Sequence, residues 1–451
     1  MLRREETICA PATSHGGAIA LVRISGPDAL QILGRIFFPT EKNADIIKRK
    51  GYSILHGEIR DTDDVIDEVL VSLFRAPHSY TGEDSAEISC HGSSYIVTRV
   101  MDLLIKAGAA SARPGEFTQR AFLNGKMDLS QAEAVADLVA SASKSAHRIA
   151  INQIRGGFSA EINKLRSEFL RFASLIELEL DFGEEDVEFA DRQELMDIIQ
   201  KTKGLTDRLS ASFKMGNVIK NGIPVAIVGK PNSGKSTLLN FLLNEDKAIV
   251  TDIPGTTRDS IEDTLNISGV IYRFIDTAGL RDTSDVVEGM GIRKTLDVIA
   301  RASVVMMVDE ASENSRDINR RADEIRKMIT DPDCRFMILV NKTDDAPASV
   351  IDDLSVEIRK KENECVLFIS AKYGTGIDEL KDHLLEITGA KHFSDEDVIV
   401  ASLRHYEALQ KVSESIGRII SGLENGIPED LIAIDIRHAI HYLGEITGEI
   451  T

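Results

Sequence analysis

The feature that most constrains this chain is the segment of residues 223–237, IPVAIVGKPNSGKST. β-forming residues lead into the pattern G-x-x-x-x-G-K-S, and apolar residues at helical spacing follow it. A phosphate-binding loop has this pattern between a strand and a helix. Its glycines let backbone N–H groups turn toward a polyphosphate, and the helix N-terminus adds its positive dipole end. The alternative, a glycine-rich turn that only joins strand to helix, is disfavoured by so long a pattern in this context.

The loop itself supplies the first predicted ligands of a nucleotide. These are Asn232, Ser233, Gly234, Lys235, Ser236 and Thr237. We expect Lys235 to reach the β- and γ-phosphates and to act in catalysis, and Ser236 to hold Mg²⁺. Asn232 has a side-chain carbonyl that suits a monovalent cation, but from the sequence alone it could equally well serve only to rigidify the loop.

Two further segments are predicted to sense the γ-phosphate. In PGTTRD, Thr256 and Thr257 lie between two β-rich runs, and Thr257 could close onto Mg²⁺ and the γ-phosphate. A later strand ends in DTAG, where Asp276 could hold Mg²⁺ through water and the N–H of Gly279 could contact the γ-phosphate. The metal ligands expected for Mg²⁺ are therefore Ser236, Thr257 and Asp276.

Two more strand ends are predicted to read the base. The segment NKTD places Asn341, Lys342 and Asp344 after an apolar run. A carboxylate there accepts from both N1–H and N2–H₂ of guanine, which adenine cannot offer, so the segment selects GTP over ATP. The backbone of a second segment can donate to the guanine O6; its residues are Ser370, Ala371 and Lys372. Ligands gathered at the carboxyl ends of parallel strands are typical of a doubly wound sheet. Residues 223 to about 385 thus resemble a Ras-type GTPase domain.

One position departs from the Ras pattern. Ras-like domains carry a glutamine after the Asp-x-x-Gly segment to orient the attacking water, and this chain has Leu280 there. Leucine cannot orient water, so hydrolysis needs another group. Glu288 follows in the same segment and could act as a water-orienting base. No arginine finger is identifiable, so a bound cation would supply the positive charge.

Composition limits the remaining possibilities. The 451 residues suggest two or three domains. A net charge of −20 argues against broad, non-specific nucleic-acid binding but not against a local basic patch. The four cysteines are scattered and form no zinc spacing or disulfide framework, so a reducing cytoplasm is expected. We find neither an apolar stretch long enough to span a bilayer nor a secretory leader.

The flanking regions predict two other kinds of domain. Residues 1–125 mix strands and helices without βαβ alternation, as in an α+β domain. Residues 126–220 and 389–451 carry helical patterns and would form one helical domain, with the GTPase domain of residues 221–388 inserted between its parts. Residues 130–133, SQAE, read as a capping box that starts a helix. Two apolar stripes read as bundle core: Leu165, Phe169, Phe172, Ile176 and Leu180, and Leu409, Val412, Ile416 and Ile419.

The whole chain resembles the MnmE (TrmE) family of tRNA-modifying GTPases. The motifs that carry this resemblance are LVRISGP, SYTGEDSAEISCHG, ARPGEFTQRAFLNGKMDLSQAEAVADL, GKPNSGKST, IPGTTRD, DTAGLR and LGEITGE. The resemblance implies an N-terminal domain similar to folate-binding domains, which dimerises and binds 5-formyl-tetrahydrofolate through Arg23, Glu87 and Lys126. Without the resemblance, these three residues read as surface charges.

The resemblance also implies the cofactors and partners. Asn232 would coordinate K⁺, with the backbone around Gly255 completing its shell, and Glu288 would position the water as two GTPase domains meet across the dimer. An FAD-containing partner, MnmG (GidA), would join in a heterotetramer. Together they would place an aminomethyl or carboxymethylaminomethyl group on C5 of a tRNA wobble uridine. The family ends in a Cys-x-Gly-Lys tail, whereas this chain stops at Thr451, so we expect a truncated sequence.

The competing interpretation is a GTPase switch that serves ribosome assembly or membrane association without group transfer. It predicts an RNA-binding appendage with a basic face, and we find none in this acidic sequence.

Overall fold

The computed structural model describes residues 5–14, 16–41, 45–182, 192–246, 263–275, 296–387 and 398–449. The chain divides into two compact units. Their bounds are Met1–Val139, Gln153–Ser167 and Leu443–Thr451 for the first, and Ala140–Asn152 and Glu168–Tyr442 for the second. No helix within the described ranges is long and apolar enough to cross a membrane.

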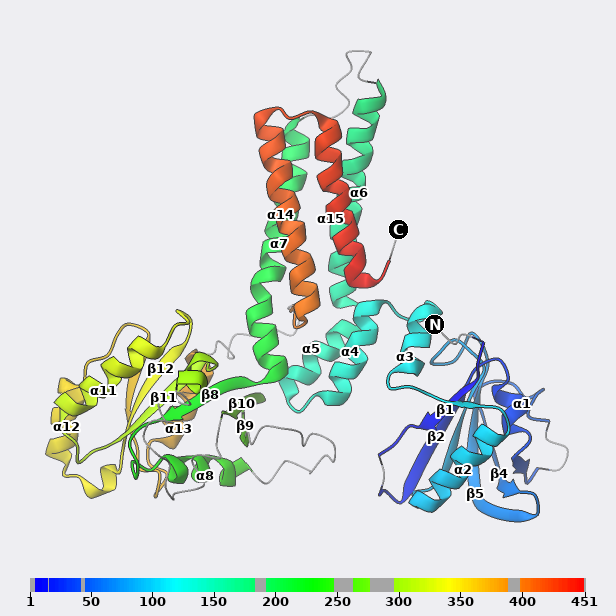
Figure 1. The fold of residues 1–451 in the computed structure, drawn as a ribbon, viewed down its shortest axis with the longest axis horizontal. Helices are drawn as coiled ribbons and strands as arrows, with labels where there is room; N and C mark the ends of the chain where they lie inside the picture. Colours follow the sequence, from blue (N-terminus) through cyan, green and yellow to red (C-terminus); the bar gives the residue numbers. More distant parts are fainter. Residues whose placement is uncertain are drawn as a thin grey trace. The chain divides into compact units, whose positions relative to one another are not determined.

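A seven-stranded sheet forms the base of the first unit (Figure 1, blue). Its strand order is β3-β4-β5-β6-β2-β1-β7, and every pair is antiparallel except β1 and β7. The strands are β1 Ile8–Pro11, β2 Ile19–Ser25, β3 Phe37–Pro39, β4 Ser53–Asp61, β5 Asp64–Phe74, β6 Ser85–His91 and β7 Ala110–Ser111. With its helices, this sheet confirms the predicted α+β class.

The two faces of this sheet differ, because successive side chains of a strand point to opposite sides. Helices α1 (Ala29–Leu33) and α2 (Ser94–Lys106) contribute to the core on one face. The other face exposes apolar side chains on three strands: Ile19 is 67% exposed, Ile54 66% and Leu70 49%. Among the described residues, the sheet is therefore packed mainly on one side.

The start of helix α4 (Leu129–Ala140), which follows α3 (Glu116–Leu123), differs from the sequence prediction. Asp128 Oδ1 accepts a hydrogen bond from the N–H of Gln131, and Gln131 Oε1 accepts one from the N–H of Asp128, each 2.9 Å long. This reciprocal pair is the capping box. The prediction that the box begins at Ser130 is wrong by two residues, because Asp128 has the same spacing to Gln131. Ser130 is instead buried and hydrogen-bonded to Ser159.

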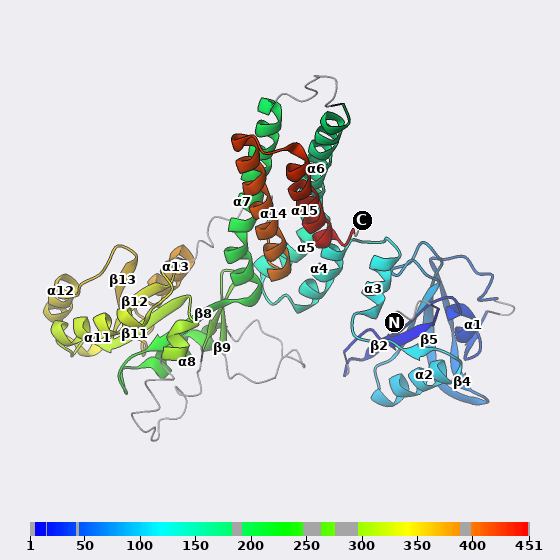
Figure 2. The same ribbon diagram turned by 45° about the horizontal axis from the view of Figure 1, so that its top comes forward.

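Long helices from before and after the segment of residues 223–387 pack side by side (Figures 1 and 2). They are α6 Gly157–Phe182, α7 Arg192–Asn221, α14 Leu403–Asn425 and α15 Glu429–Thr447, and the shorter helix α5 (Lys144–Ile154) precedes α6 in the chain. Between α7 and α14, the rings of Phe213 and Tyr406 stack with their centroids 4.4 Å apart. Both predicted stripes are buried, apart from Leu180, whose side chain lies outside the described part of the structure. The helical structure predicted for both flanks is confirmed.

The segment between those flanks forms a six-stranded sheet of order β13-β12-β11-β8-β10-β9. All pairs are parallel except β9 and β10. The strands are β8 Ile223–Val228, β9 Asp263–Ile267, β10 Val270–Phe274, β11 Val304–Glu310, β12 Arg335–Asn341 and β13 Glu364–Phe368. Strand β11 is an apolar run because parallel strands are buried on both faces.

Helices cover both faces of this second sheet. Helices α8 (Lys235–Asp246) and α13 (Ile377–Ile387) contribute to one hydrophobic core. Helices α11 (Ser315–Met328) and α12 (Ala348–Glu357) contribute to the other. This is the doubly wound arrangement predicted for the GTPase domain.

Candidate functional site

The phosphate loop joins β8 to α8, as the sequence predicts, and two glycines leave no room for a side chain. Gly229 has φ +145° and Gly234 φ +93°. A Cβ at Gly229 would lie 2.2 Å from the carbonyl oxygen of Val308, and one at Gly234 would lie 2.1 Å from Asn341 Nδ2. Asn232 adopts φ +66°, a left-handed conformation that asparagine tolerates better than most residues. The loop thus has the close-packed backbone that an anion cradle requires.

Lys235 lies at the first residue of α8, and its ammonium turns back into the loop. Its Nζ donates to the carbonyl oxygen of Gly229 at 2.9 Å and also to that of Lys230. Burial lowers the pKa of the Lys235 ammonium, and the negative charge of Asp309 opposes this shift. Ser233 is 1% exposed, and its Oγ has no hydrogen-bond partner within the described ranges. A cation held by carbonyl dipoles in a confined loop is well suited to bind phosphate oxygens.

Asn341 joins the phosphate loop to the base-reading segments. It ends strand β12 and is 2% exposed. Its Nδ2 donates to the carbonyl oxygen of Ser233 at 2.9 Å, and its Oδ1 accepts from the N–H of Ala371 at 2.9 Å. The structure therefore brings together three segments that the sequence placed separately.

Asp344 and Lys342 lie in the turn after β12. Asp344 belongs to a short 3-10 helix, η2 (Thr343–Asp345), and its Oδ1 accepts a hydrogen bond of 2.6 Å from Ser370 Oγ. Lys342 has φ +62°, and its Nζ lies 2.7 Å from Glu310 Oε1. Lys372 Nζ lies over the ring of Tyr373, 4.9 Å from its centroid. The predicted guanine-reading residues thus share one edge of the sheet.

Of the remaining residues predicted for this site, the structure describes only Ser236 and Thr237. Ser236 is half-buried and Thr237 is exposed in the first turn of α8, and a serine hydroxyl there suits Mg²⁺. The other predicted ligands and the predicted base all lie outside the described residues: Gly255, Thr256, Thr257, Asp276, Gly279 and Glu288.

A second group of charged residues lies in the first unit, far from the nucleotide segments in sequence. Arg23 on β2 and Glu87 on β6 are direct cross-strand partners. Arg23 Nε and Nη2 donate to Glu87 Oε1 at 3.0 and 2.7 Å, and each side chain is 25% exposed. The guanidinium carbon of Arg23 lies 5.2 Å from the ring centroid of Tyr80 and 5.5 Å from that of Phe117. Tyr80 and Phe117 were not predicted, since their sequence context shows only two ordinary aromatic residues.

Lys126 contacts the same loop that carries Tyr80. Its Nζ donates to the carbonyl oxygen of Pro77 at 2.9 Å, and its stem lies near Gly82, whose φ is +79°. The three predicted charges Arg23, Glu87 and Lys126 are thus linked through residues 77–82.

A buried polar network holds this loop in place, and the sequence analysis missed it. Arg120 on α3 is 4% exposed and donates to both oxygens of Glu83 at 3.2 Å and to Glu116 Oε1 at 3.3 Å. Ser25 Oγ donates to Glu83 Oε2 at 2.8 Å and lies 2.6 Å from Thr81 Oγ1. The only local signal was the four-residue spacing of Glu116 and Arg120, which is usual for a surface pair.

Two family models match most of this chain. Residues 7–126 match the family model described as the N-terminus of the GTP-binding protein TrmE. Residues 129–451 match the model of the MnmE helical domain.

Curated relatives of this chain are tRNA modification GTPases of the same family. The tRNA modification GTPase MnmE of Bacteroides thetaiotaomicron is 51% identical, over 99% of this chain and 96% of that protein. The protein of the same name from Christiangramia forsetii is 50% identical, over 100% and 97%. A solved structure of Aquifex aeolicus Era with GDP and AlF₄⁻ covers 42% of this chain and 65% of its own, at 28% identity and a TM-score of 0.29. That score is too low to establish a likeness. The curated relatives and the family models establish that this chain belongs to the MnmE family of tRNA modification GTPases and is a GTPase.

Proposed function

We propose that this protein is a K⁺-stimulated GTPase that acts on tRNA together with an FAD-containing partner, MnmG (GidA). The pair would install a carboxymethylaminomethyl or aminomethyl group on C5 of the wobble uridine, in a heterotetramer and in the cytoplasm. The observation that carries the GTPase part is the Asn341 side chain, which couples the phosphate loop to the guanine-reading segment. The group-transfer part rests on the family to which the chain belongs.

The proposed hydrolysis uses residues on both sides of the γ-phosphate. Lys235 would neutralise the phosphates, and Mg²⁺, held by Ser236, Thr257 and Asp276, would supply further positive charge. With Leu280 unable to orient water, Glu288 would take that role. K⁺ at Asn232, completed by backbone near Gly255, would replace an arginine finger. Asn232 is exposed, so a bound cation could reach its side chain.

We also propose that Arg23, Glu87 and Lys126 bind 5-formyl-tetrahydrofolate. A folate has a flat heteroaromatic ring with several hydrogen-bonding groups and a carboxylate tail. The cluster around Arg23 offers two aromatic rings, a carboxylate and two cations within one region of the first unit. These groups complement the ligand by stacking and by charge-assisted hydrogen bonds.

A homodimer through the N-terminal domain is part of the same proposal. The face of the sheet that carries Arg23 and Glu87 also exposes Ile19, Ile54 and Leu70. An apolar sheet face of this kind favours burial against another surface. A second copy would cover it beside the proposed folate site.

The modification itself can be tested in cells. Mass spectrometry of tRNA from cells that lack this protein should show wobble uridines without the C5 group. Expression of the full chain should restore the group, and expression of Lys235→Ala should not, because that variant cannot bind the phosphates productively. Unchanged wobble uridines in the deletion strain would reject the tRNA role.

The cation role can be tested by comparing salts. GTP turnover should be about tenfold or more faster in KCl than in NaCl at equal ionic strength, because the cation stabilises transition-state charge. Asn232→Ala should remove the difference, while Asn425→Ala, an exposed asparagine at the end of α14, should keep it. Equal rates for the unmodified chain in the two salts would exclude the role.

The role of Glu288 as the water-orienting base can be tested by kinetics. Glu288→Ala and Glu288→Gln should each lower kcat by about 10²-fold or more, the range of a general base, with GTP affinity nearly unchanged. Single-turnover hydrolysis and equilibrium GTP binding measure the two quantities. Turnover that stays intact in both variants would mean that another residue positions the water.

The folate site can be tested by titration of the full chain with 5-formyl-tetrahydrofolate. Arg23→Ala should weaken binding by about tenfold or more, because a hydrogen bond to a charged group contributes about 1.5–3 kcal/mol. Arg60→Ala is the matched control, since Arg60 also pairs with a glutamate, Glu58, and lies over a ring, Phe38. Equal losses in both variants would contradict a specific role of Arg23.

A further inference from the structure

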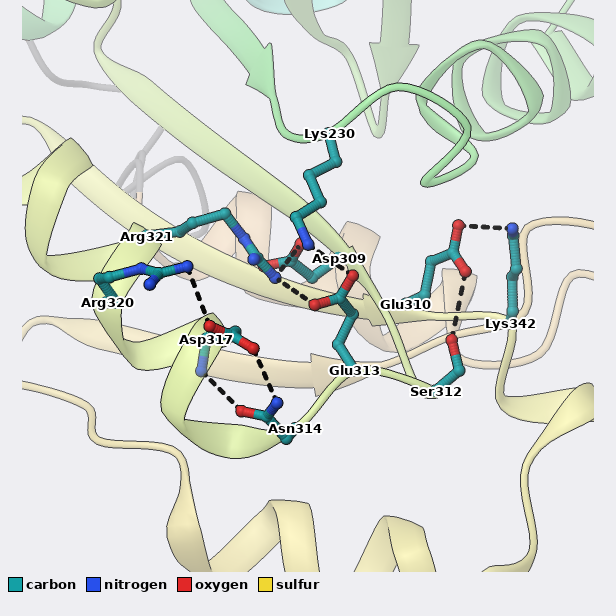
Figure 3. A network of polar contacts seen from close by, with 10 residues as sticks. All are labelled: Lys230, Asp309, Glu310, Ser312, Glu313, Asn314, Asp317, Arg320, Arg321 and Lys342. Atoms are coloured by element: carbon teal, nitrogen blue, oxygen red, sulfur yellow. Dashed lines mark hydrogen bonds and ion pairs between the residues drawn. The ribbon is translucent and has the colours of Figure 1, made fainter.

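Two carboxylates in one turn contact two lysines of the nucleotide site (Figure 3). The turn comprises residues 310–313, beginning at Glu310, the last residue of strand β11, and we call it the acidic turn. Glu313 Oε1 lies 2.7 Å from the Nζ of Lys230, in the phosphate loop. Glu310 Oε1 lies 2.7 Å from the Nζ of Lys342, in the guanine-reading segment. Neither glutamate belongs to a nucleotide-binding motif of the sequence.

Glu313 also contacts Arg321, which in turn pairs with a buried aspartate, so the three side chains alternate in charge. Glu313 Oε2 lies 3.3 Å from Arg321 Nη2 on helix α11. Arg321 in turn pairs with Asp309, with N–O distances of 2.7 and 3.0 Å, and the Asp309 side chain is 1% exposed. The hydrogen bond from Lys230 lowers the pKa of the Glu313 carboxyl, and Arg321 adds to this effect. Glu313 is therefore a fixed anion at neutral pH.

The acidic turn is also fixed at both ends. The N–H of Ala311 donates to the carbonyl oxygen of Asn341 at 2.8 Å, which ties the turn to the end of β12. Ser312 Oγ donates to Glu310 Oε2 at 3.2 Å. After the turn, Asn314 caps α11, because its Oδ1 accepts from the N–H of Asp317 at 2.9 Å. A turn anchored in this way can hold its two lysine partners at a constant separation.

We propose that Glu310 and Glu313 are positioning residues that hold the guanine-reading segment and the phosphate loop at the spacing GTP requires. Each acts through its lysine. The inference rests on the nucleotide site proposed above and adds to it a determinant of nucleotide affinity. Segments that are already ordered lose less conformational freedom when a ligand binds both of them, so the turn should strengthen binding without taking part in the chemistry.

The test measures the affinity of the full chain for a fluorescent GDP analogue and its kinetics of GTP hydrolysis. Glu313→Gln and Glu310→Gln should each weaken binding about two- to fivefold, the range expected for partly exposed ion pairs. The loss should lie mainly in a faster dissociation rate, and KM should rise while kcat at saturating GTP is retained. Unchanged affinity in both variants would overturn the proposal.

A matched control and a double-mutant cycle separate this role from a general loss of stability. Asp323→Asn removes a carboxylate of the same helix α11 that pairs with Arg326, 2.7 Å away, and contacts neither lysine, so affinity should not change. In the background of Lys230→Gln, Glu313→Gln should cost nothing further, because the partner is already gone. Additive losses, or a loss in Asp323→Asn as large as that in Glu313→Gln, would overturn the proposal.

Binding of the analogue by the unmodified chain distinguishes a failure of the acidic-turn proposal from a failure of the proposed nucleotide site. Tight binding of the analogue by the unmodified chain, with no effect of either glutamate, rejects the role of the acidic turn alone. No binding by the unmodified chain overturns the nucleotide site, and the role of the turn with it.

Discussion

The nucleotide site depends on one buried amide at the end of a central strand. Asn341 donates to the carbonyl of Ser233 and accepts from the N–H of Ala371, and Gly234 packs against its nitrogen with no space for a Cβ. An unpaired polar group at such a buried position costs about 1–3 kcal/mol. The phosphate loop, the NKTD segment and the Ser370–Lys372 segment therefore keep their relative positions together. The acidic turn joins the same assembly through the carbonyl of Asn341.

In the first unit, a buried charged side chain, Arg120, joins neighbouring segments as the buried amide of Asn341 does in the nucleotide site. Arg120 is almost fully buried, and a buried guanidinium is tolerated only when carboxylates surround it, as Glu83 and Glu116 do here. The result is a rigid loop that carries Tyr80 to the guanidinium of Arg23. The surface cluster that we propose for folate is thus built on a network that is itself hidden from the ligand.

Much of the fold was predictable from the sequence, because its signals are local. Each local feature follows from the structure of its own stretch. This holds for the glycines of the phosphate loop, the apolar run of β11 and the buried stripes of α6 and α14. The capping box of α4 shows the limit of such signals. Two overlapping patterns, at Asp128 and at Ser130, satisfied the same rule, and only packing of Ser130 against Ser159 separated them.

By itself, the sequence determined the order of the GTPase segments, the three kinds of domain and the family, since these depend on consecutive residues or on likeness along the chain. Only the tertiary structure decided which charges meet. Arg23 and Glu87 are 64 residues apart, and Lys230 and Glu313 are 83 apart. Their contacts arise from the order of strands in each sheet. An exposed glutamate in a loop has the same local pattern whether it faces water or a lysine brought from elsewhere in the fold.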